Sequence, residues 1–129
     1  MMFEPLRGSR FLVVGRAGLD LYADPPGTEI ENASGFHAAL GGSAANIAVA
    51  IAQQGGTCAL LTAVSDDAVG RYTKKALAGY GVNTAYVKTV GGEARNSLAV
   101  VETRAENCQS VIYRNGAADF ELSDTDVSS

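Results

Sequence analysis

Two glycines stand directly before a run of small and aliphatic residues in the stretch LGGSAANIAVAIAQQGG, residues 40–56. Gly41 and Gly42 let a ligand approach the backbone, and the free N–H groups of the first turn of a following helix then point toward it. Asn46 falls inside that first turn, where an amide offers both a donor and an acceptor to a hydroxylated ligand. The pattern predicts a ligand site at the start of a helix over residues 43–54. A tight turn followed by a solvated asparagine fits the same spacing equally well.

The composition is that of a globular protein in water. The chain has 129 residues, of which 47% are hydrophobic and 19% charged. No apolar run approaches the roughly 20 residues that a transmembrane helix needs. The net charge of -4 provides no basic field for a polyanion. We therefore expect neither a membrane nor a nucleic acid as a partner.

Cysteine and histidine usage argues against a metal site. Cys58 falls in an apolar run and Cys108 in a polar one, neither belongs to a CxxC pair, and the chain has a single histidine. This usage favours a reducing compartment, and we expect a cytoplasmic protein without bound zinc.

The first two thirds of the chain alternate between strand-like and helix-like patterns. A short apolar strand over residues 11–14 precedes the helix of residues 43–54. A second strand over residues 57–64 and a helix over residues 68–77, capped by Asp66, follow. The order β-α-β-α predicts a Rossmann-like parallel sheet with flanking helices.

Beyond Gly81 the pattern changes to short β-rich runs. Turn residues separate three such runs, which cover residues 85–90, 97–102 and 110–114. The prediction is a β-meander that projects from the parallel sheet, so the expected fold class is α/β with a small second sheet.

Two nucleotide-binding loops are excluded by spacing. The chain contains no GxxxxGK[ST] stretch, and Gly15 and Gly18 form GxxG rather than GxGxxG. A dinucleotide-binding fold is therefore weakly supported.

Four stretches together resemble the amino-terminal half of the ribokinase-like (PfkB) carbohydrate kinases, in order and in spacing. They are VVGRAGLDLY, LGGSAANIAVAIAQQGG, VSDDAVGRY and YGVNT, and the resemblance covers nearly the whole chain. The residues that match the first family signature are Gly41, Gly42, Asn46, Ala48 and Gly55. One position departs from the pattern, because Ser65 stands where the family usually has glycine.

The resemblance implies a partial ribokinase fold, with an α/β core over about residues 10–21 and 37–84 and a β-sheet lid over about residues 22–36 and 85–114. It implies that Asp20, Gly41, Gly42 and Asn46 bind sugar hydroxyls. Ribokinases carry asparagine at the position of Gly18 and lysine at that of Ser43, so ribose is not the expected substrate.

The resemblance also implies ATP and Mg²⁺ as cofactors and a homodimer formed through the lid. The family's catalytic aspartate and most of its nucleotide site belong to a GAGD-type motif of the carboxy-terminal half. No such motif occurs before Ser129, so we expect no catalytic residue in this stretch and no kinase activity from it alone.

The late segment VIYRNGAADFEL resembles a lid strand of 2-keto-3-deoxygluconate kinases and, more closely, of the 5-dehydro-2-deoxygluconokinases of inositol breakdown. In the keto-acid kinases the arginine of this segment faces the substrate carboxylate, and Arg114 falls on it. A guanidinium matches a carboxylate bidentately, so an acidic hexose derivative, 5-dehydro-2-deoxygluconate, is the expected substrate. The alternatives are a surface arginine on an edge strand, a kinase for a neutral sugar or a nucleoside, and a sugar-binding module without catalysis.

Overall fold

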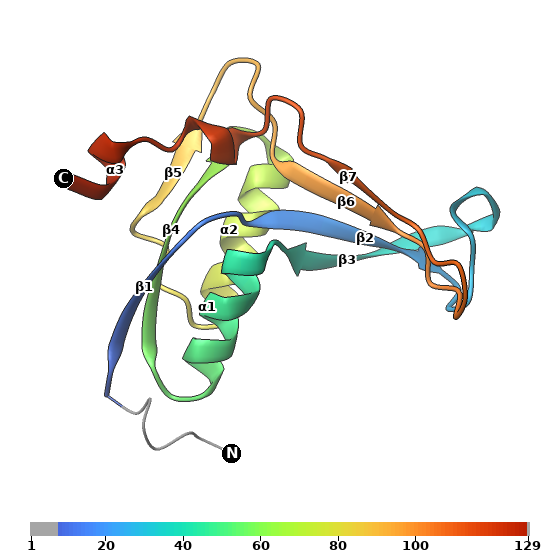
Figure 1. The fold of residues 1–129 in the computed structure, drawn as a ribbon, viewed down its shortest axis with the longest axis horizontal. Coiled ribbons are helices and arrows are strands. Elements are labelled where there is room, and N and C mark those ends of the chain that lie inside the picture. The colour runs from blue at the N-terminus through green and yellow to red at the C-terminus, as the bar shows by residue number, and fades with distance from the viewer. Residues whose placement is uncertain (1–7, 129) are drawn as a thin grey trace.

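The protein forms two β-sheets that share one helical layer at their junction (Figure 1). The computed structural model describes residues 8–128. The core sheet is parallel, in the order β1-β4-β5, with bounds Arg10–Val14, Thr57–Ser65 and Val87–Val90. The lid sheet is mixed, in the order β3-β2-β6-β7, with bounds Gly35–Gly41, Gly18–Asp24, Ser97–Val101 and Ser110–Tyr113. The predicted α/β fold with a small second sheet is confirmed.

Two helices cover one face of the core sheet, on the side from which the lid sheet projects (Figure 1). They are α1 (Ser43–Gln53) and α2 (Ala68–Gly79). The largest fully buried side chains of this layer are Leu60 and Val64 of β4 and Leu77 of α2. Within residues 8–128 there are also three short helices, namely η2 (Ile30–Asn32), η3 (Ala118–Glu121) and α3 (Asp124–Ser128).

Helix α1 packs through small residues. Periodicity alone predicts that Ile47, Ala50 and Ile51 form the face of α1 that packs on the sheet. That prediction is wrong for the first two, since Ile47 is 53% exposed and Ala50 is exposed as well. The buried face consists of alanines, namely Ala44, Ala45 and Ala48. The reason is close approach: a Cβ added to Gly15, just after β1, would lie 2.8 Å from the Ala44 Cβ.

Helix α2 is capped by the residue after the predicted one. Asp67, rather than Asp66, accepts the Gly70 N–H at 3.0 Å, which satisfies a donor that the helix leaves free. The Ser65 hydroxyl donates to the same Asp67 oxygen at 2.7 Å. Ser65, the one departure from the family pattern, therefore supports the start of this helix.

The boundary between core and lid lies elsewhere than the sequence predicts. The whole of β2 and β3 pairs within the lid sheet, so residues 18–21 and 37–41 belong to the lid and not to the core. Strand β5 is not part of a meander, because it pairs in parallel with β4, Thr62 opposite Val87. The chain returns along α2 after β4, and this βαβ path brings the next strand back parallel to the first.

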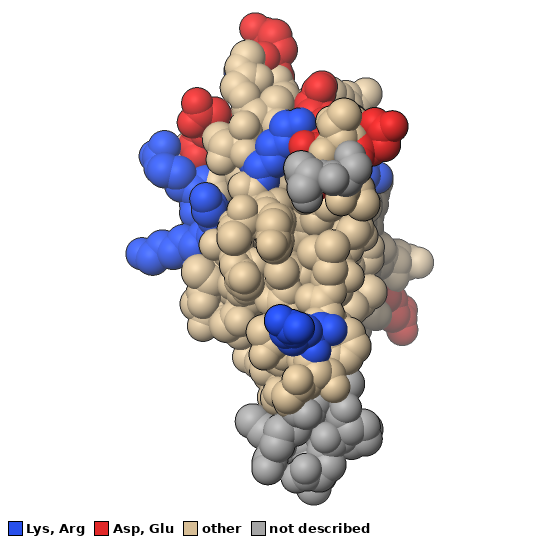
Figure 2. All heavy atoms as spheres, turned by 90° about the vertical axis from the view of Figure 1, so that its left-hand side faces the viewer, with Lys and Arg blue, Asp and Glu red and all other residues tan. Residues whose placement is uncertain are grey.

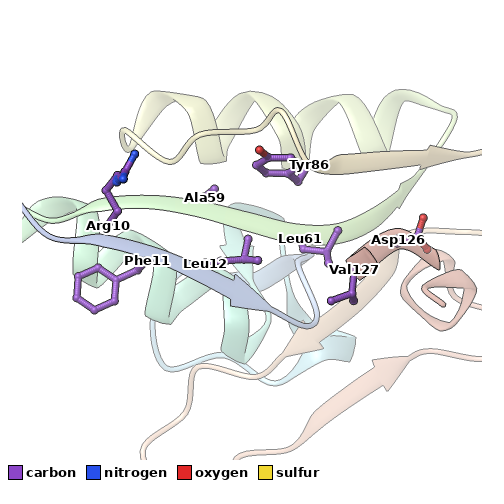
Figure 3. Close-up of a pocket in the computed structure, with 8 residues that line it drawn as sticks. All are labelled: Arg10, Phe11, Leu12, Ala59, Leu61, Tyr86, Asp126 and Val127. Atoms are coloured by element: carbon purple, nitrogen blue, oxygen red, sulfur yellow. The ribbon is translucent and has the colours of Figure 1, made fainter. Parts of the chain in front are cut away.

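The other face of the core sheet is open and largely apolar. A continuous apolar run such as residues 11–14 predicts a strand buried on both faces, yet Leu12 and Val14 are 55% and 53% exposed. In Figure 2 this face shows few charged side chains at its centre, and most of them lie near the rim. Figure 3 shows the hollow of about 400 Å³ on it, lined by Arg10, Phe11, Leu12, Ala59, Leu61, Tyr86, Asp126 and Val127.

Replacing the cap of α2 tests this account of the helix start. We expect Asp67→Ala to lower the free energy of unfolding by about 0.5–2 kcal/mol, because the Gly70 N–H loses its acceptor. Asp66→Ala is the matched control, since Asp66 is exposed and does not cap the helix. Urea denaturation of both variants measures the difference, and equal losses would contradict the assignment of the cap.

The same site predicts a pH dependence. The hydrogen bonds from Gly70 and Ser65 lower the pKa of Asp67 below its ordinary value of 3.8. The carboxylate therefore stabilises the folded state above pH 3.8, and this contribution is lost as the pH falls through the lowered pKa. We expect the stability difference between the wild type and Asp67→Ala to shrink in that acidic range, which urea denaturation at several pH values would show.

Candidate functional site

Asp20 occupies a central strand of the lid sheet. Its strand β2 pairs with β3 on one side and β6 on the other, and Asp20 lies opposite Ala39 and Ala99. Tyr22, two residues along and therefore on the same face, donates its hydroxyl to Asp20 Oδ2 at 3.2 Å. Burial, followed by the charge and hydrogen bond of Asp20, raises the pKa of Tyr22, so the phenol stays protonated and donates.

Gly41 is required by the position of the Asp20 carboxylate. A Cβ added to Gly41 would collide with the whole carboxyl group, since even the farther oxygen would lie 2.8 Å away. Only a residue without a side chain leaves room for the carboxylate over the backbone at this point. The acid of β2 and the last residue of β3 are therefore in direct contact.

Gly42 serves a different purpose at the start of α1. It is the residue before the helix, and its φ of 94° lies in the region that favours glycine. A Cβ there would also collide with the Arg16 carbonyl oxygen, which accepts the Ala45 N–H at 3.2 Å. The double glycine thus joins the lid to α1, and each glycine makes its own close contact: Gly41 with the Asp20 carboxylate and Gly42 with the Arg16 carbonyl.

Asn46 lies one turn into α1 and is exposed. Its backbone N–H donates to the Gly42 carbonyl at 3.0 Å. Within residues 8–128 its side-chain amide has no hydrogen-bond partner, so both its donor and its acceptor are available. The structure brings Asp20 and Gly41 into contact, places Gly42 against Arg16, and sets Asn46 one helical turn beyond Gly42.

Arg16 lies between β1 and β2, and Ser97 is the first residue of β6. Sequence reasoning did not single out either residue. Arg16 Nη1 donates to Ser97 Oγ at 2.8 Å across the sheet. A Cβ added to Gly18 would lie 2.7 Å from the Ser97 carbonyl oxygen, so this position excludes a side chain. The contact joins residues 81 positions apart, and nothing in the local sequence signals it.

Arg114 follows directly after β7 and makes its contacts with η3. Its Nε donates to Asp119 Oδ2 at 3.1 Å, and its Nη2 forms an ion pair with the same oxygen. Its guanidinium carbon lies 4.5 Å from the centre of the Phe120 ring. The arginine is thus neither free nor solvated on all sides, and Asp119 and Phe120 are functional candidates that the sequence alone did not single out.

The register of the lid sheet relates Arg114 to Asp20. Asp20 pairs with Ala99, and Ala99 pairs with Ile112, so these three side chains share one face. Arg114 follows directly after the end of β7, two positions beyond Ile112. The lid sheet therefore carries Asp20 on a central strand, and its edge strand β7 leads directly into Arg114.

Two hollows among the described residues do not include Asp20 or Arg114. One is the hollow on the open face of the core sheet, and the other, also of about 400 Å³, lies beside the start of α2 and the strands β6 and β7. A binding surface that is open on one side does not enclose a hollow. The candidate site is therefore identified by the chemistry of its side chains and not by its shape.

Across residues 8–128, no three His, Cys, Asp or Glu side chains gather closely enough to hold a metal ion. In the same part of the chain, no helix has both the length and the apolar character to cross a membrane.

Sequence comparison relates almost the whole chain to one family. The family pattern "pfkB family carbohydrate kinase" matches residues 9–129. The 5-dehydro-2-deoxygluconokinase of Photobacterium profundum is 42% identical over 111 residues, which is 86% of this chain and 34% of the relative. That of Geobacillus kaustophilus is 31% identical over 97% of this chain and 38% of the relative. The chain therefore spans a little over a third of the length of these curated relatives.

Solved structures agree on the fold. The 2-dehydro-3-deoxygluconokinase of Thermotoga maritima superposes with a TM-score of 0.83 at 26% identity, covering 92% of this chain and 36% of that one. The fructokinase of Xylella fastidiosa with bound ATP superposes with a TM-score of 0.78 at 28% identity, covering 92% and 37%. With the family pattern, the sequence identities and these folds in agreement, the chain belongs to the pfkB family of carbohydrate kinases.

Proposed function

We propose that the protein carrying this chain is an ATP-dependent kinase for a hydroxyl group of an acidic hexose derivative, 5-dehydro-2-deoxygluconate. The observation that carries the proposal is the Asp20 carboxylate held over Gly41, in a lid sheet whose edge strand β7 leads directly into Arg114. The names of the similar relatives, 5-dehydro-2-deoxygluconokinases, support the substrate class.

Asp20 and Asn46 bind the sugar hydroxyls in this proposal. A carboxylate that accepts two hydroxyl hydrogen bonds orients a polyol more firmly than neutral acceptors do. The amide of Asn46, without a partner among the described residues, adds a donor and an acceptor from α1. Together they orient the acceptor hydroxyl from the lid and from the helix.

Arg114 binds the substrate carboxylate. It follows directly after the lid strand β7, and its charge and planar fork suit a carboxylate better than a neutral hydroxyl. An acidic sugar would then span from the carboxylate-binding arginine to the hydroxyl-binding aspartate.

ATP and Mg²⁺ enter the proposal through the family. A similar fructokinase structure holds ATP, which supplies the transferred γ-phosphoryl group when bound. The described residues do not fit either group, because they include neither a phosphate-loop motif nor a cluster of metal-ligating side chains. The residues of this chain therefore act on the sugar.

We also propose that the protein acts in the cytoplasm and takes part in the breakdown of inositol. Cys58 and Cys108 are both free thiols, which suits a reducing compartment. The assignment to inositol breakdown follows from the proposed substrate alone.

We also propose a homodimer that forms through the lid. Phe36 and Tyr113 are 45% and 56% exposed, and alternation assigns both to the lid face opposite Asp20. Exposed aromatic side chains are enriched at protein interfaces. Sedimentation at several concentrations should show a dimer that Phe36→Ser weakens, and a monomer at every concentration would contradict it.

Replacing Arg114 tests the substrate class. We expect Arg114→Ala to raise KM for 5-dehydro-2-deoxygluconate by roughly ten- to a hundredfold, equivalent to the loss of about 1.5–3 kcal/mol from a charged hydrogen bond. Arg71→Ala, on the exposed side of α2, is the control. Steady-state kinetics with the acid sugar, fructose and adenosine decides between acidic and neutral substrates, and an unchanged KM for the acid would refute the role of Arg114.

Replacing Asp20 tests the hydroxyl site. We expect Asp20→Asn to lower kcat/KM at least about tenfold for every sugar substrate, acidic or neutral, because the charged acceptor is common to all of them. The same site can be perturbed without changing a charge. Gly41→Ala puts a Cβ into the Asp20 carboxyl group, whereas Gly35→Ala meets nothing within 4 Å and serves as its control. Full kcat/KM in both Asp20→Asn and Gly41→Ala would remove Asp20 from the site.

A further inference from the structure

We infer that Asp119 is a positioning residue that sets the Arg114 guanidinium with its free end toward the substrate carboxylate. The inference rests on the proposed function, because it assigns a partner to the arginine that the proposal places on the acid sugar.

Asp119 is a buried acid in a short helix that is itself held firmly. Its side chain is 3% exposed, and the preceding Ala118 is fully buried. Ala118 donates its N–H to the Arg95 carbonyl at 2.8 Å, and η3 packs against β4 of the core sheet. A carboxylate buried at such a place needs a cationic partner, and Arg114 is the one that it has.

The geometry of the pair leaves one edge of the arginine unused. Arg114 donates Nε and Nη2 to a single oxygen of Asp119, Oδ2. Its Nη1 has no hydrogen-bond partner among residues 8–128. The guanidinium is a planar fork with five N–H groups, so the side edge is occupied and the end edge, Nη1 and the second N–H of Nη2, is available for a bidentate carboxylate.

Phe120 restrains the same group from another direction. The centre of its ring lies 4.5 Å from the guanidinium carbon, a distance typical of a cation–π contact. A free arginine side chain loses much rotamer freedom when it binds a ligand, and a side chain that is already held loses less. Asp119 and Phe120 thus hold the arginine in position before the substrate arrives.

The competing explanation is that Asp119 and Arg114 form an ion pair that only stabilises the fold. The two explanations predict different effects of replacing Asp119. The Asp119 Oδ1 atom is buried without a hydrogen-bond partner among the described residues, so the carboxylate is not fully used by the fold. A structural pair would lower stability and leave the relative affinity for acidic and neutral sugars unchanged. A positioning residue changes KM for the acid sugar alone.

The test uses the full-length protein and measures KM, kcat and Tm with 5-dehydro-2-deoxygluconate and with an analogue that carries a hydroxymethyl group in place of the carboxylate. We expect Asp119→Asn to raise KM for the acid about fivefold or more, with kcat and the KM of the neutral analogue within about twofold. Asp119→Glu keeps the charge but displaces the guanidinium by one methylene, and it raises the acid KM by at least about twofold. Asp124→Asn, an exposed acid of α3, is the matched control and leaves all values unchanged.

A double variant provides the second criterion. Because Asp119 acts through Arg114, Arg114→Ala with Asp119→Asn should bind the acid no more weakly than Arg114→Ala alone. An acid KM unchanged in Asp119→Asn, or in Asp119→Glu where the asparagine variant does not fold, would overturn the inference. Equal increases for acid and neutral sugars would overturn it too.

The outcomes separate this inference from the proposed function. If Arg114→Ala leaves the acid KM unchanged, the proposed substrate class is wrong and Asp119 has nothing to position. If Arg114→Ala raises the acid KM and the Asp119 variants do not, the proposed function stands and the role of Asp119 alone is refuted.

Discussion

The contact between the Asp20 carboxylate and the backbone of Gly41 is the constraint on which the candidate site depends. It joins the middle of β2 to the end of β3, and the chain enters α1 one residue later. Any side chain at Gly41 would displace the carboxylate, and any side chain at Gly42 would displace the Arg16 carbonyl that anchors the helix start. The acid, the glycines and the helix start are therefore packed directly against one another.

Close packing explains why small residues dominate this region. Alanines form the buried face of α1 because the helix lies against the end of β1, where even Gly15 has no room for a Cβ. Gly18 meets the Ser97 carbonyl in the same way at the root of the lid. Small side chains contribute little apolar area, so they serve here to let backbones approach rather than to build the core, which Leu60, Val64 and Leu77 supply.

The lid combines segments that are distant in the sequence. Strand β2 pairs in parallel with β6, and the two are separated in the sequence by β3, α1, β4, α2 and β5. This pairing brings Asp20 and the segment that leads into Arg114 into one sheet, and η3, which packs against β4, supplies Asp119 and Phe120 as contacts of the arginine. In the proposed function, the Asp20 carboxylate and the Arg114 guanidinium contact opposite ends of one acidic sugar.

The sequence by itself determined the fold class, the helix after the double glycine and the family, because these depend on local periodicity, on glycine spacing and on short motifs. It did not determine the cap of α2, where Asp66 and Asp67 are adjacent and only the backbone path selects Asp67. It also assigned β5 to the lid, since a short β-rich run does not reveal its partner strand. The ion pair of Arg114 with Asp119 and the contact of Arg16 with Ser97 were decided by tertiary structure alone. The physical reason is the same in both cases: such contacts form between side chains that only the folded chain brings together. The partner of a strand, likewise, cannot be read from the residues of that strand alone.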